Sequence, residues 1–598
     1  MRKQWLFHTA GAILLGAFAW VIYAPGFKGS FHLDDFTSIV QNRYIRIDGL
    51  APATLFRAAF QDFRQNRPLT NLSFALNYYA GRLHPSSYHL VNFCILLFSG
   101  LGLWLWLCRL FARLGFPDSR SMLTGWLGAM AWIAHPLNVQ AVTYITQRGA
   151  ALAGGFSLWC IYFYHLALED YRRRWLFHLG WIFFCLLALL SKETALVLPA
   201  IVLAYKIYFF DEPGPGWLKR NWKWLALLAV FYLAAAGFLL RPGIRGRIFE
   251  YSAVPFSGVE KFLSGPRTFF WYLALTLFPF PSRLSLSHDF PVSSGLFSPL
   301  STFLSWLALL CALFLVFIRG RLSRMFSFAV IWFLGWLLVE AMPLPIDLVN
   351  EHRLYLAMLA VMLWPIATPV LLLKKPWPAV AAAVIVICSL GFFSRQRNQV
   401  WLDELSLWMD VTQKSPGVGR WWSNYCGALL EAGKLEKAGA ACRVAVGLDP
   451  RHAGVHINLG NIFFQLGDYS RAGKEYEEAL GLEPQSALAY FDLALVRIAQ
   501  QDLTAAGKLM AEAERVGSPD AVLYFNLGQV YEKLEEPANA MRVLQRAVAL
   551  RPEWSEPRLK LAGTLLGQGR CREAVELVRG SPVPDPRFEQ ILRGCGAR

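Results

Sequence analysis

Two adjacent aspartates, Asp34 and Asp35 in the segment FHLDDFTSIVQN, directly follow the first long apolar stretch of the chain. Carboxylates beside a membrane span are costly unless they are paired, hydrated or used in chemistry. One interpretation is a helix N-cap with a solvated neighbour, because aspartate is a favoured capping residue. The other is a general base, since a positioned carboxylate can take a proton from an attacking hydroxyl.

The composition defines the class of protein that must position these acids. The 598 residues are 55% hydrophobic and 15% aromatic, with a mean hydropathy of +0.37. These values are typical of a polytopic membrane protein and exclude a purely soluble one. Long apolar runs fill residues 1–394, whereas the rest has a soluble composition. We therefore predict an all-α protein with a membrane domain over 1–394, a linker helix over 395–418 and a second domain over 419–598.

Eleven apolar runs predict about eleven transmembrane helices. The first lies near the N-terminus and is interpreted as a retained signal-anchor, because it lacks a clear cleavage site. The others cover roughly 88–110, 121–143, 150–168, 175–190, 194–210, 222–240, 300–318, 325–342, 354–373 and 376–394.

The basic loops predict the orientation of these helices. Clusters near Arg113, Arg173, Arg220, Arg321 and Lys374 all fall on one side, which the positive-inside rule assigns to the cytoplasm. The N-terminus is then cytoplasmic, and the first loop (25–87) and the second domain are extracytoplasmic. The short proline-flanked run 266–281 would reverse later loops if it crossed, so we expect it to be re-entrant or interfacial.

The first outer loop contains arginines where arginine is normally sparse: Arg43, Arg46, Arg57, Arg64, Arg67 and Arg82. The planar guanidinium fits phosphate oxygens, so this cluster indicates a phosphorylated ligand. Pairing with Asp48, Asp62 and lipid headgroups is the alternative.

The second domain repeats with a period of 34 residues. One register contains Leu459, Leu493, Leu527 and Leu561; a second contains Ala438, Ala472, Ala506, Ala540 and Ala574. Small residues at Gly460, Ala494, Gly528 and Ala562 allow close helix approach, and Pro450, Pro484 and Pro552 end helices. This is the tetratricopeptide (TPR) pattern, with about five units stacked as an α-solenoid that binds extended protein segments. A structural cap or a dimerisation surface is the alternative.

The ten cysteines are too dispersed for a metal framework. Cys426 and Cys442 are expected on facing helices of the first repeat, where they could form a disulfide in an oxidising compartment.

Other polar motifs lie at the outer ends of the predicted spans: His135 and Arg148, then Lys192 and Glu193, then Glu351, His352 and Arg353. Individually they could be interfacial anchors. The predicted topology brings all of them to the face of Asp34 and Asp35. Carboxylates beside cations fit transfer of a group from a lipid phosphate to a hydroxyl, with the cations stabilising the departing phosphate.

The ordered motifs FHLDDF, RPLTNLSFALNY, SSYHLVN, HPLNVQAVTYITQR, LLSKETALVLP, RLSLSHDFP and EHRLYL resemble the bacterial relatives of the transmembrane-and-TPR (TMTC-like) protein O-mannosyltransferases, in the GT-C glycosyltransferase superfamily. The resemblance covers the membrane domain nearly end to end, and the repeats match the same architecture.

The resemblance implies an inverting enzyme that moves a sugar, typically mannose, from a polyprenyl phosphate to serine or threonine hydroxyls of exported proteins. Asp34 or Asp35 matches the catalytic acid, with Asp34 favoured as base and Asp35 as positioning group. The donor pocket would be lined by Arg67, His135, Arg148, Lys192, Glu193, Glu351, His352 and Arg353. Val139 and Gln140, and Ser287 and His288, depart from the pattern, so sugar or acceptor preference could differ.

No third carboxylate motif accompanies the doublet, so no essential metal or other cofactor is expected, although a divalent ion is the alternative. The expected partners are the lipid-linked sugar, membrane lipid and a protein bound by the repeats, which is either the acceptor or an assembly partner; nucleic acid is not expected. The expected location is the bacterial inner membrane. Three alternatives remain: a GT-C enzyme acting on lipid, cell-wall glycan or whole oligosaccharides, a non-catalytic TPR scaffold, and a transporter.

Overall fold

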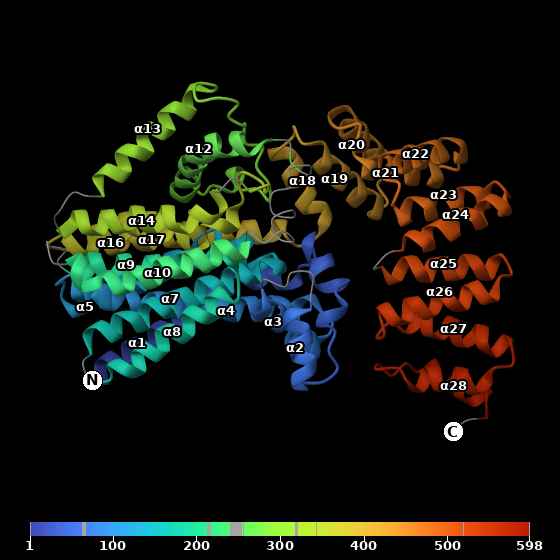
Figure 1. Ribbon diagram of the computed structural model, residues 1–598, viewed down its shortest axis with the longest axis horizontal. Coiled ribbons are helices and arrows are strands. Elements are labelled where there is room, and N and C mark those ends of the chain that lie inside the picture. Colours follow the sequence, from blue (N-terminus) through green and yellow to red (C-terminus); the bar gives the residue numbers. More distant parts are fainter. Residues whose placement is uncertain are drawn as a thin grey trace. The chain divides into compact units, whose positions relative to one another are not determined.

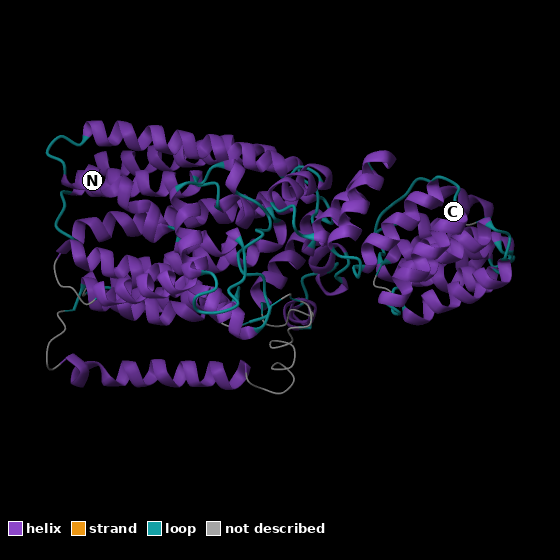
Figure 2. Cartoon of the chain, turned by 90° about the horizontal axis from the view of Figure 1, so that it is seen from above, coloured by secondary structure: helices purple, strands orange, loops and turns teal. Residues whose placement is uncertain are grey.

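The computed structural model describes residues 2–61, 67–170, 172–211, 217–239, 254, 256–316, 321–341, 344–517 and 520–596. Every regular element among these residues is helical, as Figure 2 shows. The chain divides into two compact units, Met1–Ser415 and Pro416–Arg598. The segment expected as a linker helix, 395–418, is not a single helix. It holds the end of one helix, a second helix and the start of the repeat unit.

The first unit is a bundle of helices of unequal length (Figure 1). Its helices are α1 (Arg2–Tyr23), α2 (Pro52–Phe60), α3 (Pro68–Gly81), α4 (Pro85–Arg113), α5 (Asp118–Ala134), α6 (Asn138–Thr143), α7 (Arg148–Glu169), α8 (Arg174–Leu189), α9 (Leu198–Phe209), α10 (Trp217–Leu239), α12 (Gly258–Leu277), α13 (Leu300–Leu315), α14 (Arg321–Ala341), α15 (Leu354–Ala357), α16 (Leu359–Leu372), α17 (Trp377–Val400) and α18 (Glu404–Lys414). Helix α4 packs against α5 and α7, and α5 also packs against α16 and α17.

Most predicted apolar runs coincide with one helix, but 121–143, 194–210 and 354–373 are interrupted, and about eleven crossings are not supported. Among the described residues, four helices are long and apolar enough to span a membrane: Phe7–Lys28, Pro85–Arg113, Ile145–Glu169 and Trp377–Val400. The pair Glu351–Ala357 and Leu359–Leu372, bent by 47°, would make a fifth. Three further apolar helical segments among the described residues are shorter: Arg174–Leu189, Leu300–Leu315 and Arg324–Val339. Helix α8, for example, has 16 residues, which rise about 24 Å and fall short of a bilayer core of about 30 Å.

Interruptions in this bundle occur at the polar motifs that the sequence indicated. Helix α5 ends at Ala134, because Pro136 disfavours a helical conformation at His135. A 3-10 turn, Glu193–Val197, separates α8 from α9, and another, Glu351–Arg353, precedes α15. The predicted run 121–143 is therefore two helices. At these interruptions the chain exposes backbone polar groups and side chains that a continuous helix would direct elsewhere.

The second unit contains five consecutive helix pairs (Figure 1). They are α19 (Gly419–Glu431) with α20 (Leu435–Leu448), α21 (Ala453–Gln465) with α22 (Tyr469–Leu482), α23 (Ala487–Ala499) with α24 (Leu503–Val516), α25 (Ala521–Lys533) with α26 (Pro537–Leu550), and α27 (Ser555–Gly567) with α28 (Cys571–Arg579), followed by α29 (Phe588–Gly594). The predicted solenoid is confirmed. A Cβ at Gly460 would lie 2.5 Å from the Tyr476 ring, so the helices approach there as the small residues predicted.

The turn within each pair repeats one backbone conformation. Gly433, Gly467, Gln501, Glu535 and Gly569 are spaced by 34 residues and have φ values of 71, 76, 65, 59 and 75°. Glycine adopts this left-handed conformation without the steric cost that a Cβ adds. Gln501 and Glu535 therefore occupy positions that favour glycine.

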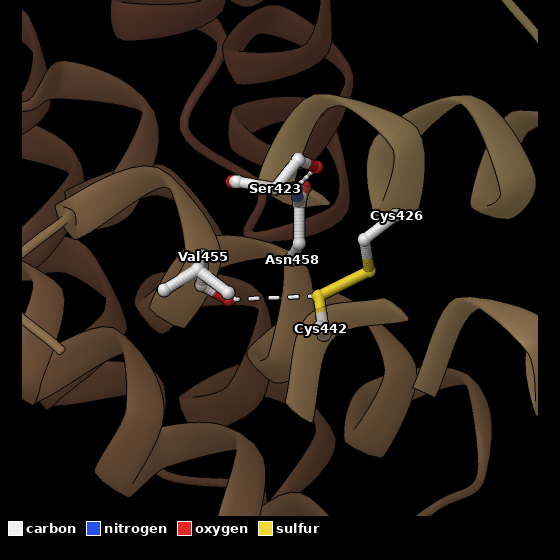
Figure 3. Close-up of a disulfide and its surroundings, with 5 residues drawn as sticks. All are labelled: Ser423, Cys426, Cys442, Val455 and Asn458. Carbon is white, nitrogen blue, oxygen red and sulfur yellow. Dashed lines mark hydrogen bonds between the residues drawn. A yellow bond between two sulfur atoms is a disulfide. The ribbon is translucent and has the colours of Figure 1, made fainter. Parts of the chain in front are cut away.

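Two disulfides join helices of the second unit. Cys426 of α19 and Cys442 of α20 are bonded, as the spacing predicted (Figure 3). Beside this bond, the amide of Asn458 on α21 donates to the Ser423 carbonyl of α19 (2.9 Å), which links neighbouring repeats. The second disulfide, Cys571–Cys595, was not predicted from the sequence. It connects α28 to the segment that follows α29.

Candidate functional site

The two aspartates of the doublet have different environments. Asp35 is fully buried, and its Oδ1 accepts a hydrogen bond from the Thr146 backbone N–H (2.7 Å) and another from the Thr146 hydroxyl. Its Oδ2 accepts from the His32 backbone N–H (3.0 Å). Burial raises the pKa of Asp35 to about 6, although these hydrogen bonds and the nearby His32 ring oppose the shift. A carboxylate engaged by three donors holds its loop in one conformation.

Asp34, in contrast, is exposed. Its backbone N–H donates to the Tyr144 hydroxyl (3.1 Å), so the main chain is fixed while the side chain can meet an external reactant. The preceding residue, Leu33, has a φ of 46°, which is unusual for a residue with a side chain. The turn that presents Asp34 is therefore strained and held by its contacts. This geometry favours Asp34 over Asp35 as the reacting carboxylate.

Sequence reasoning missed His32, which is buried directly beside the doublet. Its Nδ1 contacts Glu404 Oε1 of α18 (2.8 Å), and its Nε2 contacts the Trp401 carbonyl oxygen (3.0 Å). The Trp401 indole stacks on the Tyr144 ring, with centroids 5.3 Å apart. The junction between α17 and α18 thus supports the acidic loop. The only local sequence signal was the position of His32 within FHLDDF; its partners lie about 370 residues away in sequence.

A second group of charged residues surrounds the 3-10 turn after α8. Arg67 Nε donates to Glu193 Oε2 (2.9 Å), and its Nη2 donates to Oε1. Burial would raise the pKa of the Glu193 carboxyl, but Arg67, with Lys192 nearby, holds it at about 2 instead. This bidentate pair neutralises Arg67 within the protein. Arg64, from the same predicted cluster, lies outside the described residues.

Lys192, His352 and Arg353 line one small cavity of about 30 Å³, together with Thr194, Trp336 and Tyr355. His352 thus shares the cavity with the cations Lys192 and Arg353. Its Nδ1 atom is buried without a hydrogen-bond partner among the residues that the structure describes. The cavity combines two cations with an imidazole, which suits an anionic group.

One short segment connects the acidic loop to this cationic group. Gln140, on α6, accepts a hydrogen bond from the His352 backbone N–H (2.7 Å). Tyr144 and Thr146, a few residues later, contact Asp34 and Asp35. Tyr144 is four positions after Gln140, so their Cα atoms lie within about 14 Å of each other. Residues 138–147 therefore contact Asp34 and Asp35 at one point and, at another, His352, which shares its cavity with Lys192 and Arg353.

The remaining predicted residues have protein partners that give them structural roles. The Arg148 guanidinium is buried and donates to the oxygens of Asn92, Asn77, Tyr88 and Ser73, all of them neutral acceptors. His135 Nε2 contacts the Thr276 carbonyl (3.0 Å).

Glu351 is buried and accepts from the Ser285 backbone N–H (2.6 Å), with His288 Nε2 at 3.1 Å. We leave Arg148, His135 and Glu351 out of the phosphate site that we propose. In the part of the chain that the structure describes, no group of three or more histidine, cysteine or acidic side chains could hold a metal ion.

Comparison with known proteins follows the same division into two units. The family patterns described as "TPR repeat" and "Tetratricopeptide repeat" match residues 460–501 and 521–553. A solved structure titled "Functional Characterization of Pseudomonas Aeruginosa pilF" is 20% identical to the chain, with a TM-score of 0.26. The match covers 30% of this chain and 82% of that one.

Among curated proteins, Protein O-mannosyl-transferase Tmtc3 of Drosophila melanogaster is 26% identical over 474 residues, which are 68% of this chain and 51% of that protein. Protein O-mannosyl-transferase TMTC3 of Mus musculus is 23% identical over 499 residues, or 73% and 51%. The chain spans about half the length of these relatives. The expected similarity to TMTC protein O-mannosyl-transferases with TPR repeats is confirmed. The apolar helices together with these relatives indicate an integral membrane protein.

Proposed function

Because the chain is a homologue of the TMTC protein O-mannosyl-transferases, we propose that it is a glycosyltransferase acting on proteins. It moves mannose or another hexose from a polyprenyl phosphate to serine or threonine hydroxyls of exported proteins. The observation that carries the proposal is the exposed Asp34 carboxylate on a loop fixed by hydrogen bonds, linked through residues 138–147 to a cationic cavity.

Asp34 acts as the general base in this reaction. Its carboxylate removes the proton of the acceptor hydroxyl while the hydroxyl oxygen attacks C1 of the sugar. The bond between C1 and the phosphate oxygen breaks, and the polyprenyl phosphate leaves with the electron pair. Attack opposite the leaving group inverts C1, and Asp34 afterwards releases its proton to water. Asp35 holds the loop and does not itself transfer the proton.

Lys192 and Arg353 stabilise the departing phosphate. Both side chains line the cavity that also contains His352, and a fixed cation placed where negative charge develops lowers the barrier most in a site that excludes water. The His352 ring, which lines the same cavity, can donate a hydrogen bond to a phosphate oxygen. Arg67 contributes indirectly, because its pairing with Glu193 fixes the turn that carries Lys192.

The sugar transfer takes place on the extracytoplasmic side of the bacterial inner membrane, with the N-terminus in the cytoplasm. The two disulfides of the repeat unit support this orientation, because disulfides persist in oxidising compartments. The repeat unit recruits the acceptor protein. Its helix pairs support this role, since stacked repeats present extended binding surfaces. The proposed reaction needs no metal.

A reconstituted assay tests the proposal. The purified full-length chain in nanodiscs is mixed with mannosyl-phosphoryl-polyprenol and exported proteins from the same cells, and acceptors are weighed by intact-protein mass spectrometry. A gain of one hexose is expected. Asp34→Asn should lower the rate by about 10² to 10⁴-fold, the usual contribution of a general base.

Asp48→Asn is the matched control, because Asp48 is also an exposed acid of the first loop but pairs with Arg82 (2.7 Å). It should transfer at the normal rate. No hexose on any protein with the unaltered chain, or full activity in Asp34→Asn, would refute the proposal. Hexose found on a lipid instead would favour a lipid or glycan acceptor.

A further inference from the structure

His32 is placed so that both nitrogens of its ring contact oxygens that act as acceptors. The Trp401 oxygen is a backbone carbonyl and can only accept. The other oxygen of the Glu404 carboxylate, Oε2, also acts as an acceptor, because it receives a hydrogen bond from the Trp408 indole N–H. Two acceptors require two N–H donors from the ring. A histidine that donates to both is an imidazolium.

This cation is buried next to the acidic loop. His32 is 1% exposed, and its backbone N–H and carbonyl oxygen bond to the Asp35 carboxylate and the Asp35 N–H (3.0 and 2.8 Å). Burial alone would lower the pKa of His32, but the hydrogen bond and charge of Glu404, the Trp401 carbonyl and Asp35 raise it above its usual value. A buried charge is tolerated when such partners surround it.

We propose that His32 is a positioning residue that carries a positive charge at neutral pH. The charged chain Glu404–His32–Asp35 holds the strained turn at Leu33 that presents Asp34. This inference rests on the proposed function, because Asp34 is its reacting group. Loss of the His32 proton removes one donor and leaves two carboxylates without the cation between them. The turn then loosens, and Asp34 is no longer held toward the acceptor.

Several other charged and titratable groups lie near His32. His89 lies on α4, and its Nε2 is 3.3 Å from the Gly29 carbonyl oxygen. It interacts electrostatically with His32. Arg148 on α7 interacts with Asp35 through its charge. The Tyr144 hydroxyl, on the adjoining segment, bonds to the Asp34 N–H. Of these groups, Glu404 is the one that bonds directly to the His32 ring and carries a charge opposite to it.

Glu404→Gln tests the proposal, because glutamine keeps the shape and an accepting oxygen but removes the charge. The full-length variant in nanodiscs is compared with the unaltered chain by hydrogen exchange of residues 31–41 between pH 5.5 and 8. Protection should be similar at pH 5.5 and about tenfold weaker in the variant at pH 7.5, since loss of the carboxylate lowers the pKa of His32 by about one unit or more. The alkaline limb of the transfer rate should move to lower pH by the same amount.

Glu169→Gln is the matched control. Glu169 also pairs with a buried histidine, His165 (3.1 Å), but it ends α7, about 32 Å along that helix from Arg148. It should leave exchange of 31–41 and the pH profile unchanged. A variant Glu404→Gln whose protection and rate change equally at every pH would overturn the proposal, because a merely structural contact behaves that way. If the unaltered chain transfers no sugar, the proposed function fails, while the exchange experiment still decides the role of His32.

Discussion

The acidic loop and the helical repeats each bury an aspartate, but only the loop supplies hydrogen-bond donors to both oxygens of its carboxylate. Asp35 is 0% exposed and accepts three hydrogen bonds. Asp492, on α23, is 9% exposed, and its Oδ2 is buried without a partner among the described residues. Residues 34 positions before and after Asp492 are Asn458 and Asn526. A buried carboxylate therefore organises structure only where donors are supplied; elsewhere it costs stability.

The largest expected effect is in the loop. Asp35→Ala leaves the Thr146 N–H, the Thr146 hydroxyl and the His32 N–H without their acceptor, so it should destabilise the first unit by about 5 kcal/mol, at roughly 1.5–3 kcal/mol for each bond to a charged group. Thermal unfolding of the full chain measures this loss. Asp34→Ala is the control and should unfold at the normal temperature. Equal stability of the two variants would mean that the three hydrogen bonds to Asp35 do not stabilise the first unit.

In the repeats, removal of the buried carboxylate should raise stability instead of lowering it. Burial raises the pKa of Asp492 to about 7, above its value of about 3.9 in an unfolded chain. The native state then binds its proton more tightly, so stability falls as pH rises from about 4 through 7. Asp492→Asn removes that loss and should stabilise α23 by up to about 4 kcal/mol at pH 8.

At pH 4 the same variant should gain less than about 1 kcal/mol, because Asp492 is then protonated in the native state and about half protonated in the unfolded chain. Hydrogen exchange of residues 487–499 in the full chain measures both values. The asparagine can also donate to a carbonyl of the preceding repeat, as Asn458 does to Ser423. A gain that is equal at pH 4 and pH 8 would show that packing, rather than charge, causes it.

Disulfides sharpen the contrast between the two units. The second unit holds two of them, whereas the six cysteines of the first unit are free. Replacing Cys426 and Cys442 together by serine should destabilise the first repeat by about 3 kcal/mol, as expected for a loop of this length. A reductant should have a similar effect on the unaltered chain. Exchange of residues 419–448 measures it, and α4 serves as the internal reference.

The smallest effect concerns backbone strain. Glu535 has a φ of 59° where three other repeats have glycine, so Glu535→Gly should stabilise the fourth repeat by about 1 kcal/mol. Leu33→Gly relieves a similar angle in the acidic loop, but there it should slow sugar transfer, because a freer turn holds Asp34 less well. If both substitutions raised stability without changing transfer, strain in the loop would have no functional meaning.

The sequence predicted those features that depend on local patterns. The 34-residue period gave the repeats, the small residues at their contacts and the Cys426–Cys442 pair, because each relates residues one repeat or less apart. The acidic doublet and the charged motifs were recognised by residue type. Crossing number was overestimated, since apolar length alone does not reveal where a proline or a 3-10 turn ends a helix.

Roles that depend on distant contacts escaped prediction. Nothing near Arg148 shows that Asn77, Asn92 and two carbonyls will occupy its guanidinium. His32 depends in the same way on Trp401 and Glu404 at the far end of the first unit's sequence. Only the folded chain shows which cations are enclosed by neutral acceptors and which line a cavity.

The shared φ angle of the five repeat turns has a consequence for the length of the solenoid. Because each repeat contacts chiefly its neighbours, removing residues 487–520, one full period, should leave every remaining turn with its original geometry. Ser486, whose hydroxyl caps α23, would then precede α25 in place of Asp520, another capping residue. The repeat unit can thus be shortened or extended in whole steps, which changes the reach of its binding surface while the membrane unit and its acidic loop stay the same.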